Sequence, residues 1–138
     1  MNLASIRIIT PEIKHLVQFY ENVTHLSAHW YTEDFAEISG TTCTLAIGST
    51  YTLGLFGKDL RHTGHTGSVI IEFRVSNVDE QYEKIKDLLS DIIQEPTTMP
   101  WGNRSLMFRD PDGNLVNFFT PLTADAIKNS VSRFLMLL

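Results

Sequence analysis

The stretch FRDPDGNLVNF, residues 108–118, contains the strongest turn signal in the chain. Its centre, Asp110-Pro111-Asp112-Gly113, has proline in the second position and glycine in the fourth, as a tight turn prefers. Apolar residues on both sides predict two strands, at about 105–109 and 115–120. Asp110 and Asp112 could also be a pair of catalytic carboxylates, but the turn accounts for both.

The residues before and after this hairpin extend the pattern. Residues 68–75 predict a strongly apolar strand, and Ser76 or Asn77 can cap a helix that follows it. Residues around 92–94 predict a further strand. A final helix over 123–138 carries one apolar stripe, which consists of Ile127, Val131, Phe134, Leu135 and Leu138.

The first half of the chain has the same order of elements. Pro11 suits the first turn of a helix, with Thr10 as its cap. Residues 51–56 extend or follow the last strand of this half. The predicted strands are 6–10, 27–32, 35–39 and 43–47.

The two halves predict an internal repeat. A shift of 65 residues superimposes apolar positions, for example Ile6 on Ile71 and Val17 on Tyr82. Coincidence between two strand–helix units is the alternative, and we favour the repeat. Because side chains alternate across a strand, one face of each first strand packs against the helix. The opposite faces carry Ser5, Arg7 and Ile9 in one half and Ile70, Glu72 and Arg74 in the other.

The quoted run, together with Phe19-Tyr20 at the end of the first predicted helix, resembles the vicinal oxygen chelate superfamily. This superfamily includes glyoxalase I, extradiol dioxygenases, fosfomycin-resistance enzymes and bleomycin-resistance proteins. The resemblance covers about residues 3–121. It implies an α+β fold, in which two βαβββ modules form an eight-stranded half-open roll around a cup-shaped site.

The resemblance also implies how the chain is divided and assembled. Residues 1–138 form a single domain of this type, which is expected to be a homodimer. Its parts are module one at about 1–57, a connector at 58–66, module two at about 67–121 and the C-terminal helix at about 123–138.

Enzymes of this superfamily bind a divalent metal through His and Glu side chains in the cup. Carried onto this chain, the ligand positions are Ser5, Ile70 and Asn117, with a fourth somewhere near residues 53–55. Such metals prefer imidazole nitrogen or carboxylate oxygen, which these residues do not supply. We therefore expect neither a metal nor another cofactor.

Three other residues with reactive side chains have simpler explanations. His62 and His65 lie in the glycine-rich connector without an obvious third ligand, and exposed loop histidines are the better interpretation. Cys43 has no histidine positioned beside it, so we predict a small buried residue and not a nucleophile.

Composition excludes several classes of protein. The formal charge is -5, from 11 Lys plus Arg against 16 Asp plus Glu, which argues against nucleic-acid binding through a basic surface. A single cysteine excludes an internal disulfide. We find neither a signal-peptide pattern nor an apolar run long enough to cross a membrane, so we expect a cytoplasmic protein without membrane association.

The cup is expected to bind an unidentified small molecule. Arg7 and Glu72 are equivalent in the repeat, and they form either a buried structural ion pair or a pair that opens to a polar ligand. Aromatic side chains could stack on a flat ligand. No catalytic residue is assigned; the candidate ligand-binding residues are Arg7, Glu72, Trp101, Asn117, Ser5, Arg104, Trp30 and Phe56.

Two classes of function therefore compete. We favour a metal-independent binding or sequestration protein of the bleomycin-resistance type. The alternative is a glyoxalase-like lyase, isomerase or dioxygenase with a displaced metal site, and bound metal after purification would distinguish the two. A third, weaker hypothesis is a domain whose C-terminal stripe docks another protein.

Overall fold

The computed structural model describes residues 1, 3–55 and 69–128. Within the chain, two compact units can be distinguished, Met1–His65 and Thr66–Leu138. The predicted connector, the candidate residue Phe56 and most of the predicted C-terminal helix lie outside the described residues. Residues 124–128, at the start of that helix, are helical.

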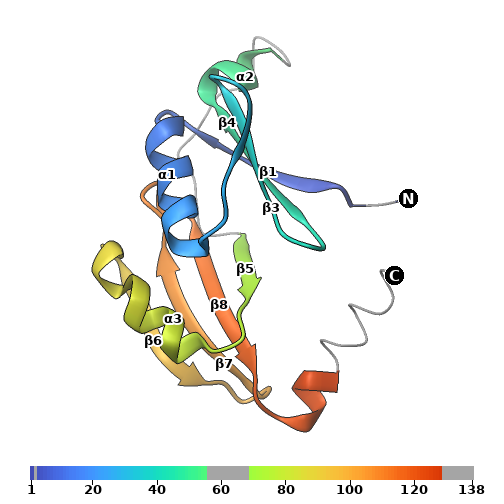
Figure 1. Cartoon of the computed structure of the whole chain (residues 1–138), viewed down its shortest axis with the longest axis vertical. Coiled ribbons are helices and arrows are strands. Elements are labelled where there is room, and N and C mark those ends of the chain that lie inside the picture. The colour runs from blue at the N-terminus through green and yellow to red at the C-terminus, as the bar shows by residue number, and fades with distance from the viewer. Residues whose placement is uncertain (2, 56–68, 129–138) are drawn as a thin grey trace. The chain divides into compact units, whose positions relative to one another are not determined.

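The first unit is a four-stranded sheet with one long helix (Figure 1). Its strand order is β1-β4-β3-β2, with β1 parallel to β4 and the other pairs antiparallel. Its elements are β1 (Ser5–Thr10), α1 (Ile13–Thr24), β2 (His29–Thr32), β3 (Phe35–Ser39), β4 (Thr44–Ser49) and α2 (Thr50–Gly54).

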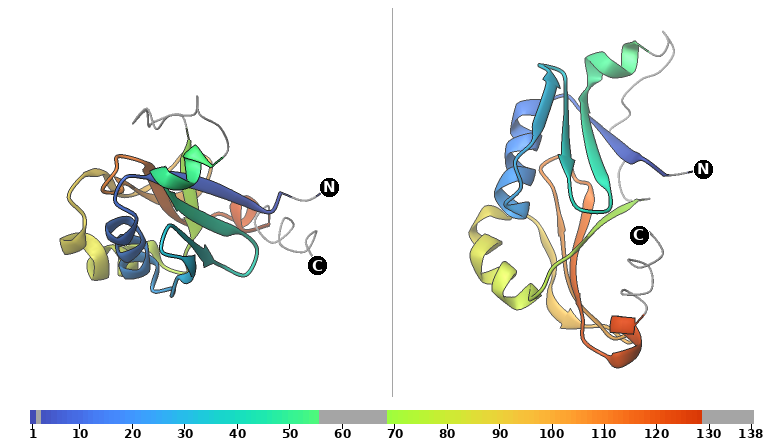
Figure 2. Two further views of the ribbon diagram at one scale, coloured as in Figure 1. Left: turned by 90° about the horizontal axis from the view of Figure 1, so that it is seen from above. Right: turned by 45° about the vertical axis from the view of Figure 1, so that its right-hand side comes forward.

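The second unit repeats this topology. Its strand order is β5-β8-β7-β6, and β5 is parallel to β8 (Figure 2). Its elements are β5 (Ile70–Arg74), α3 (Val78–Ile85), the 3-10 turn η1 (Lys86–Leu88), β6 (Ile92–Thr98), β7 (Asn103–Arg109) and β8 (Leu115–Pro121). The predicted α+β fold with two βαβββ modules is confirmed.

Local sequence explains where the helices and the main turn form. Asn77 caps α3, because its side chain accepts a hydrogen bond from the backbone N–H of Glu80. Asp110 is 3% exposed and anchors the turn between β7 and β8. Its Oδ1 accepts hydrogen bonds from the backbone N–H groups of Asp112 and Asn114, at 2.9 Å each. This turn is therefore structural, as its proline and glycine positions predict.

Two local predictions were wrong, and a third is decided between its two alternatives. α1 begins at Ile13 with Glu12 at its N-cap, because the Thr10 side chain instead accepts a hydrogen bond from the backbone N–H of Glu12 before the helix starts. Of the two alternatives for residues 51–56, the structure supports the second, because residues 50–54 form a helix that follows β4. Cys43 is exposed, because it lies in the turn between β3 and β4 and not within a strand.

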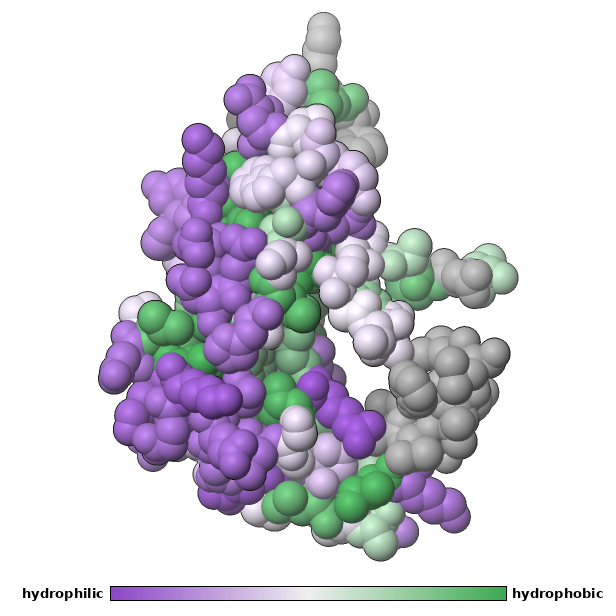
Figure 3. All heavy atoms as spheres, in the orientation of Figure 1, coloured by the Kyte–Doolittle hydropathy of each residue, from purple (hydrophilic) through white to green (hydrophobic). Residues whose placement is uncertain are grey.

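Each unit has its apolar core between the sheet and its long helix. α1 contacts β3 and β4, and α3 contacts β6, β7 and β8 (Figures 1 and 2). Hydrophilic side chains cover the outer sides of α1 and α3, as Figure 3 shows. None of the helices within the described residues has the length and apolar character needed to cross a lipid bilayer.

Candidate functional site

Two of the predicted site residues meet on one face of the second sheet. Glu72 on β5 pairs with Asn117 on β8, and Asn117 pairs with Met107 on β7. The three residues therefore form one row across adjacent strands. Within this row, Asn117 Nδ2 donates a 2.8 Å hydrogen bond to Glu72 Oε2. The carboxylate is exposed, whereas the amide is 7% exposed.

This row lies on the sheet face opposite α3. Val116 and Phe118, which flank Asn117 on β8, are 0% and 1% exposed. Phe118 packs edge-to-face against Phe108, with ring centroids 5.2 Å apart, in the core beneath the helix. Because side chains alternate along a strand, Asn117 must point to the other face. The predicted face assignment of Glu72 is therefore confirmed.

Asn117 has an unsatisfied acceptor. Its Oδ1 is buried and accepts no hydrogen bond from any described residue. The amide cannot simply be reversed, because an ionised Glu72 carboxylate accepts only and requires the Nδ2 end. Leaving a buried acceptor unpaired costs about 1–3 kcal/mol. A bound molecule that donates hydrogen bonds would satisfy Oδ1 and the remaining acceptor capacity of Glu72.

The equivalent row of the first sheet contains Arg7, Ala46 and Glu37. The Arg7 guanidinium carbon lies 4.4 Å from the centroid of the Phe35 ring, a cation–π geometry. Gly48 leaves room beneath it, because a Cβ there would lie 3.6 Å from Arg7 Cδ. This row therefore carries a stacked cation, Arg7, and a carboxylate, Glu37, with the small Ala46 between them.

Tyr31 on the edge strand β2 contacts the Glu37 carboxylate of this row. A hydrogen bond to the Glu37 carboxylate raises the pKa of the Tyr31 hydroxyl, because the ionised phenolate would lose that bond and repel the carboxylate. The Tyr31 ring also lies 5.6 Å from that of Phe35, and its side chain is 58% exposed.

Arg7 and Glu72 are both exposed and each has contacts within its own unit, so neither is a buried charge.

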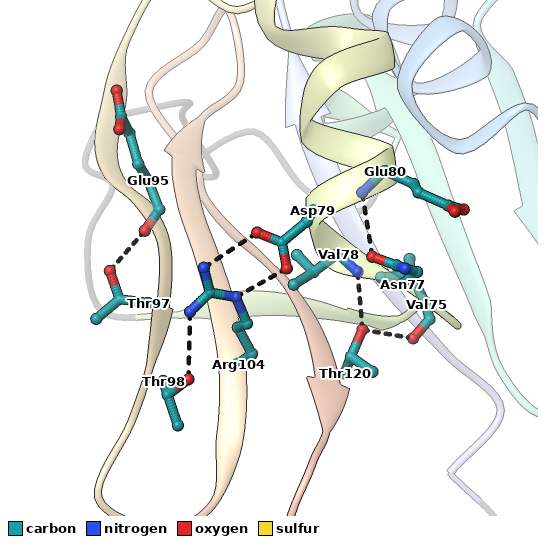
Figure 4. Close-up of polar contacts among 10 residues, drawn as sticks. All are labelled: Val75, Asn77, Val78, Asp79, Glu80, Glu95, Thr97, Thr98, Arg104 and Thr120. Carbon is teal, nitrogen blue, oxygen red and sulfur yellow. Dashed lines mark hydrogen bonds and ion pairs between the residues drawn. The ribbon is translucent and has the colours of Figure 1, made fainter.

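Arg104 lies on the opposite face from Asn117. It pairs with Thr120 on β8, and its guanidinium forms two hydrogen bonds to Asp79 of α3, at 2.8 and 3.0 Å (Figure 4). A third, at 3.2 Å, goes to the Thr98 hydroxyl. The hydrogen bonds from Arg104 lower the pKa of the Asp79 carboxyl. Arg104 thus links β7 to α3, and we do not place it in the proposed site.

The remaining predicted residues are not brought to the Glu72–Asn117 pair. Trp101 is 63% exposed in the turn between β6 and β7. Trp30 on β2 pairs with the fully buried Ala36, on the face of the sheet that α1 covers, and is 39% exposed. Ser5 begins β1 and is exposed.

The residues at these positions do not fit the divalent metal that the resemblance implies. The fourth ligand position was expected near residues 53–55, but that expectation was wrong because the fourth strand is Thr44–Ser49. Ala46 on β4 occupies the place that Asn117 occupies on β8, beside Arg7 instead of Glu72. The positions thus carry Ser5, Ala46, Ile70 and Asn117, which provide one hydroxyl and one amide. Within the described part of the chain, no three His, Cys, Asp or Glu residues cluster as a metal site.

The hydrogen bond between Asn117 and Glu72 was not predicted, although both residues were. A usable signal existed: in a βαβββ module the first and last strands are parallel neighbours, which places residue 72 close to residue 117. Neighbouring Met107 was missed because an isolated methionine in an apolar strand carries no distinguishing pattern.

Comparison with known proteins identifies relatives along almost the whole chain. The family model described as Glyoxalase/Bleomycin resistance protein/Dioxygenase superfamily matches residues 2–118. The uncharacterized protein YraH of Bacillus subtilis (strain 168) is 25% identical over 128 residues, which are 88% of this chain and 100% of YraH.

Two solved structures illustrate the similarity in fold. A glyoxalase/bleomycin resistance protein/dioxygenase family enzyme from Burkholderia phytofirmans PsJN matches with a TM-score of 0.79 and 16% identity, over 88% of this chain and 100% of that one. Lactoylglutathione lyase from Agrobacterium tumefaciens matches with a TM-score of 0.67 and 18% identity, over 86% and 92%. At these identities the similarity demonstrates the shared fold alone.

Proposed function

Because this chain belongs to the glyoxalase/bleomycin resistance protein/dioxygenase superfamily, we propose that it is a metal-independent protein that binds or sequesters a small molecule. The observation that carries the proposal is the buried Asn117 Oδ1, which lacks a donor, beside the exposed Glu72 carboxylate. Buried acceptors without a hydrogen-bond donor are uncommon in folded proteins, and this one lies next to the exposed Glu72 carboxylate, which supports a binding role.

The chemistry of this pair selects the ligand class. Asn117 Oδ1 and the Glu72 carboxylate are both acceptors, so the ligand must donate hydrogen bonds, and a positive charge would strengthen the bond to Glu72. An amidinium, guanidinium or ammonium group has these properties. Oδ1 is buried in the free protein, and Met107 lies next to it in the row. A flexible methionine side chain can change rotamer to admit the ligand.

The first test uses benzamidine, with neutral benzamide as the matched probe, in calorimetric titrations. We expect benzamidine to bind more tightly than benzamide, and Glu72→Gln to weaken benzamidine by about 10-fold or more, since a hydrogen bond to a charged group contributes about 1.5–3 kcal/mol. The matched control is Glu80→Gln, which removes the same charge from an exposed residue of α3. Equal affinities for both probes, or equal losses in both variants, would contradict the proposal.

A second variant separates binding from folding. Asn117→Leu removes the unsatisfied acceptor and replaces it with an apolar group of similar size. The melting temperature should therefore stay the same or rise, while benzamidine binding is lost. A large fall in the melting temperature would show that Asn117 has a structural role instead.

The alternative function is a lyase, isomerase or dioxygenase with a displaced metal site, and the described residues form no cluster of three His, Cys, Asp or Glu side chains that could hold such a metal. Such an enzyme would need a new set of donors, and the positions that the fold provides carry Ser5, Ala46, Ile70 and Asn117. The metal-independent proposal therefore rests on donor chemistry as well as on the Glu72–Asn117 pair.

We also propose that the chain forms a homodimer. In the first sheet β2 is an edge strand, and its Trp30 and Tyr31 side chains are 39% and 58% exposed. Unpaired strand edges with exposed aromatic residues favour association with another chain. Sedimentation velocity at micromolar concentration should give twice the mass of 15.7 kDa. A monomer under these conditions would overturn this proposal.

A further inference from the structure

A second concave site lies in the same unit, where β5 and β8 end. It is a pocket of about 460 Å³, within the size range of small-molecule sites. It does not include Glu72 or Asn117. Its lining residues are Arg74, Val75, Ser76, Thr120, Pro121 and Ile127.

Hydrogen bonds hold one wall of this pocket in place. The Thr120 hydroxyl donates to the Val75 carbonyl at 2.9 Å and accepts from the backbone N–H of Val78 at 3.0 Å (Figure 4). The backbone N–H of Val75 donates to the Phe119 carbonyl at 2.9 Å. The segment between β5 and α3 is therefore fixed to β8, and the pocket wall is already formed without a ligand.

Arg74 supplies a positive charge that forms no direct ion pair with any described residue. The other two arginines of the described second unit each lie beside a carboxylate, Arg104 beside Asp79 and Arg109 beside Asp91. Arg74 is exposed and has no hydrogen-bond or ion-pair partner within residues 1, 3–55 and 69–128. An unpaired guanidinium in a pocket is suited to a carboxylate, which it can bind through two parallel hydrogen bonds.

Apolar side chains border the same pocket. Pro121 and Ile127 line it, and Ile127 is 43% exposed with Leu122 close by in the chain at 49%. Figure 3 shows hydrophobic surface gathered where the chain passes from β8 into its last described helical turn. A ligand with a short hydrocarbon chain would cover this surface, which a simple inorganic anion would leave exposed to water.

We propose that this pocket binds a small amphiphilic anion, a monocarboxylate with a short hydrocarbon chain. The carboxylate pairs with the Arg74 guanidinium and accepts a hydrogen bond from the Ser76 hydroxyl, and the chain packs on Pro121 and Ile127. This site is separate from the Glu72–Asn117 pair, and its ligand has the opposite charge.

The test is a calorimetric titration with hexanoate, butyrate, inorganic phosphate and hexylammonium. We expect hexanoate to bind more tightly than butyrate, by up to about 15-fold for two methylene groups, and hexylammonium not to bind at this site. Phosphate binding as tight as that of hexanoate would overturn the amphiphile assignment. Absence of hexanoate binding at millimolar concentration would overturn the site altogether.

Variants locate the binding. Arg74→Gln should weaken hexanoate by at least 10-fold with an unchanged melting temperature, because the side chain is exposed and unpaired. The matched control Lys84→Gln removes the same charge from an exposed position on α3 and should change the affinity less than twofold. Equal effects of the two variants would mean that only net charge matters, and would refute the site.

Glu72→Gln distinguishes this site from the proposed cation site. Glu72 precedes Arg74 by two residues on the same face of β5, about 7 Å away along a strand. Its negative charge opposes the binding of an anion at Arg74. Glu72→Gln should therefore strengthen hexanoate binding a few-fold while it weakens benzamidine binding. Weakened binding of both probes would contradict the assignment of two separate sites.

Discussion

Replacing Phe118 with alanine is expected to lower the free energy of unfolding by about 3–5 kcal/mol, the range for deleting a buried phenylalanine. Phe118 is 1% exposed and stands between two other rings, with centroid distances of 5.4 Å to Phe73 and 5.2 Å to Phe108. The substitution removes both edge-to-face contacts and leaves a cavity between the second sheet and α3. Urea denaturation, with the slope of the transition compared between variants, measures the loss.

Phe119 provides the matched control for this prediction. It is the next residue of β8, points to the opposite face and is only half-buried. Phe119→Ala deletes the same group but should cost clearly less, because water already reaches part of the ring. If the two variants lost the same stability, the assignment of the core to the α3 side of the sheet would be wrong.

Gly102→Ala is the second large effect that we expect, about 2–6 kcal/mol. Gly102 has a φ of 94°, which alanine adopts only with strain of about 1–3 kcal/mol. A Cβ would also lie 2.8 Å from Thr123 Cγ2 and closer still to Thr123 Oγ1. Such overpacking lowers the free energy of unfolding by a further 1–3 kcal/mol, roughly. Thermal and urea unfolding should both show the loss.

The double variant separates these two causes. Thr123→Ala in the Gly102→Ala background, compared with Thr123→Ala alone, should recover the part due to crowding but not the part due to backbone strain. The single variant is needed because the Thr123 hydroxyl accepts a hydrogen bond from the backbone N–H of Ala126 at 3.1 Å, which both Thr123 variants lose. Gly40→Ala is the control, because a Cβ there would approach only the Cys43 carbonyl, at 3.8 Å, and the φ is not positive. It should change stability by no more than about 0.5 kcal/mol. No recovery in the double variant would show that strain alone explains the effect.

The fold could be predicted because its signals are local. The proline and glycine of the turn at 110–113, the alternation along 70–74 and the spacing of apolar residues in α1 each depend on neighbouring residues alone. The repeat then placed Arg7 and Glu72 in equivalent positions, and both lie in the middle rows of their sheets.

The details of the site depend on contacts that no local pattern encodes. Arg104 was expected beside the ligand, but its partner is Asp79, 25 residues earlier in the chain and on a helix that crosses the opposite face. The fourth metal position was misplaced because residues 50–54 turn into a helix, so β4 ends earlier than expected. That Asn117 Oδ1 stays without a donor follows from the hydrogen bond between Asn117 Nδ2 and Glu72, which no local sequence pattern encodes.

In both units the first strand lies beside the last one, β1 beside β4 and β5 beside β8, and this has a consequence for the order of folding. β5 has no partner strand until the residues up to Pro121 have been synthesised, because it pairs with β8, the last strand of the unit. Until then β5 has an unpaired backbone edge, and its apolar side chains Ile70, Ile71 and Phe73 are not yet covered, a combination that promotes aggregation. We therefore expect slower translation of residues 115–121 to lower the soluble yield of this protein. The same delay placed before residue 70 should lower the yield less, because β5 has not yet been made.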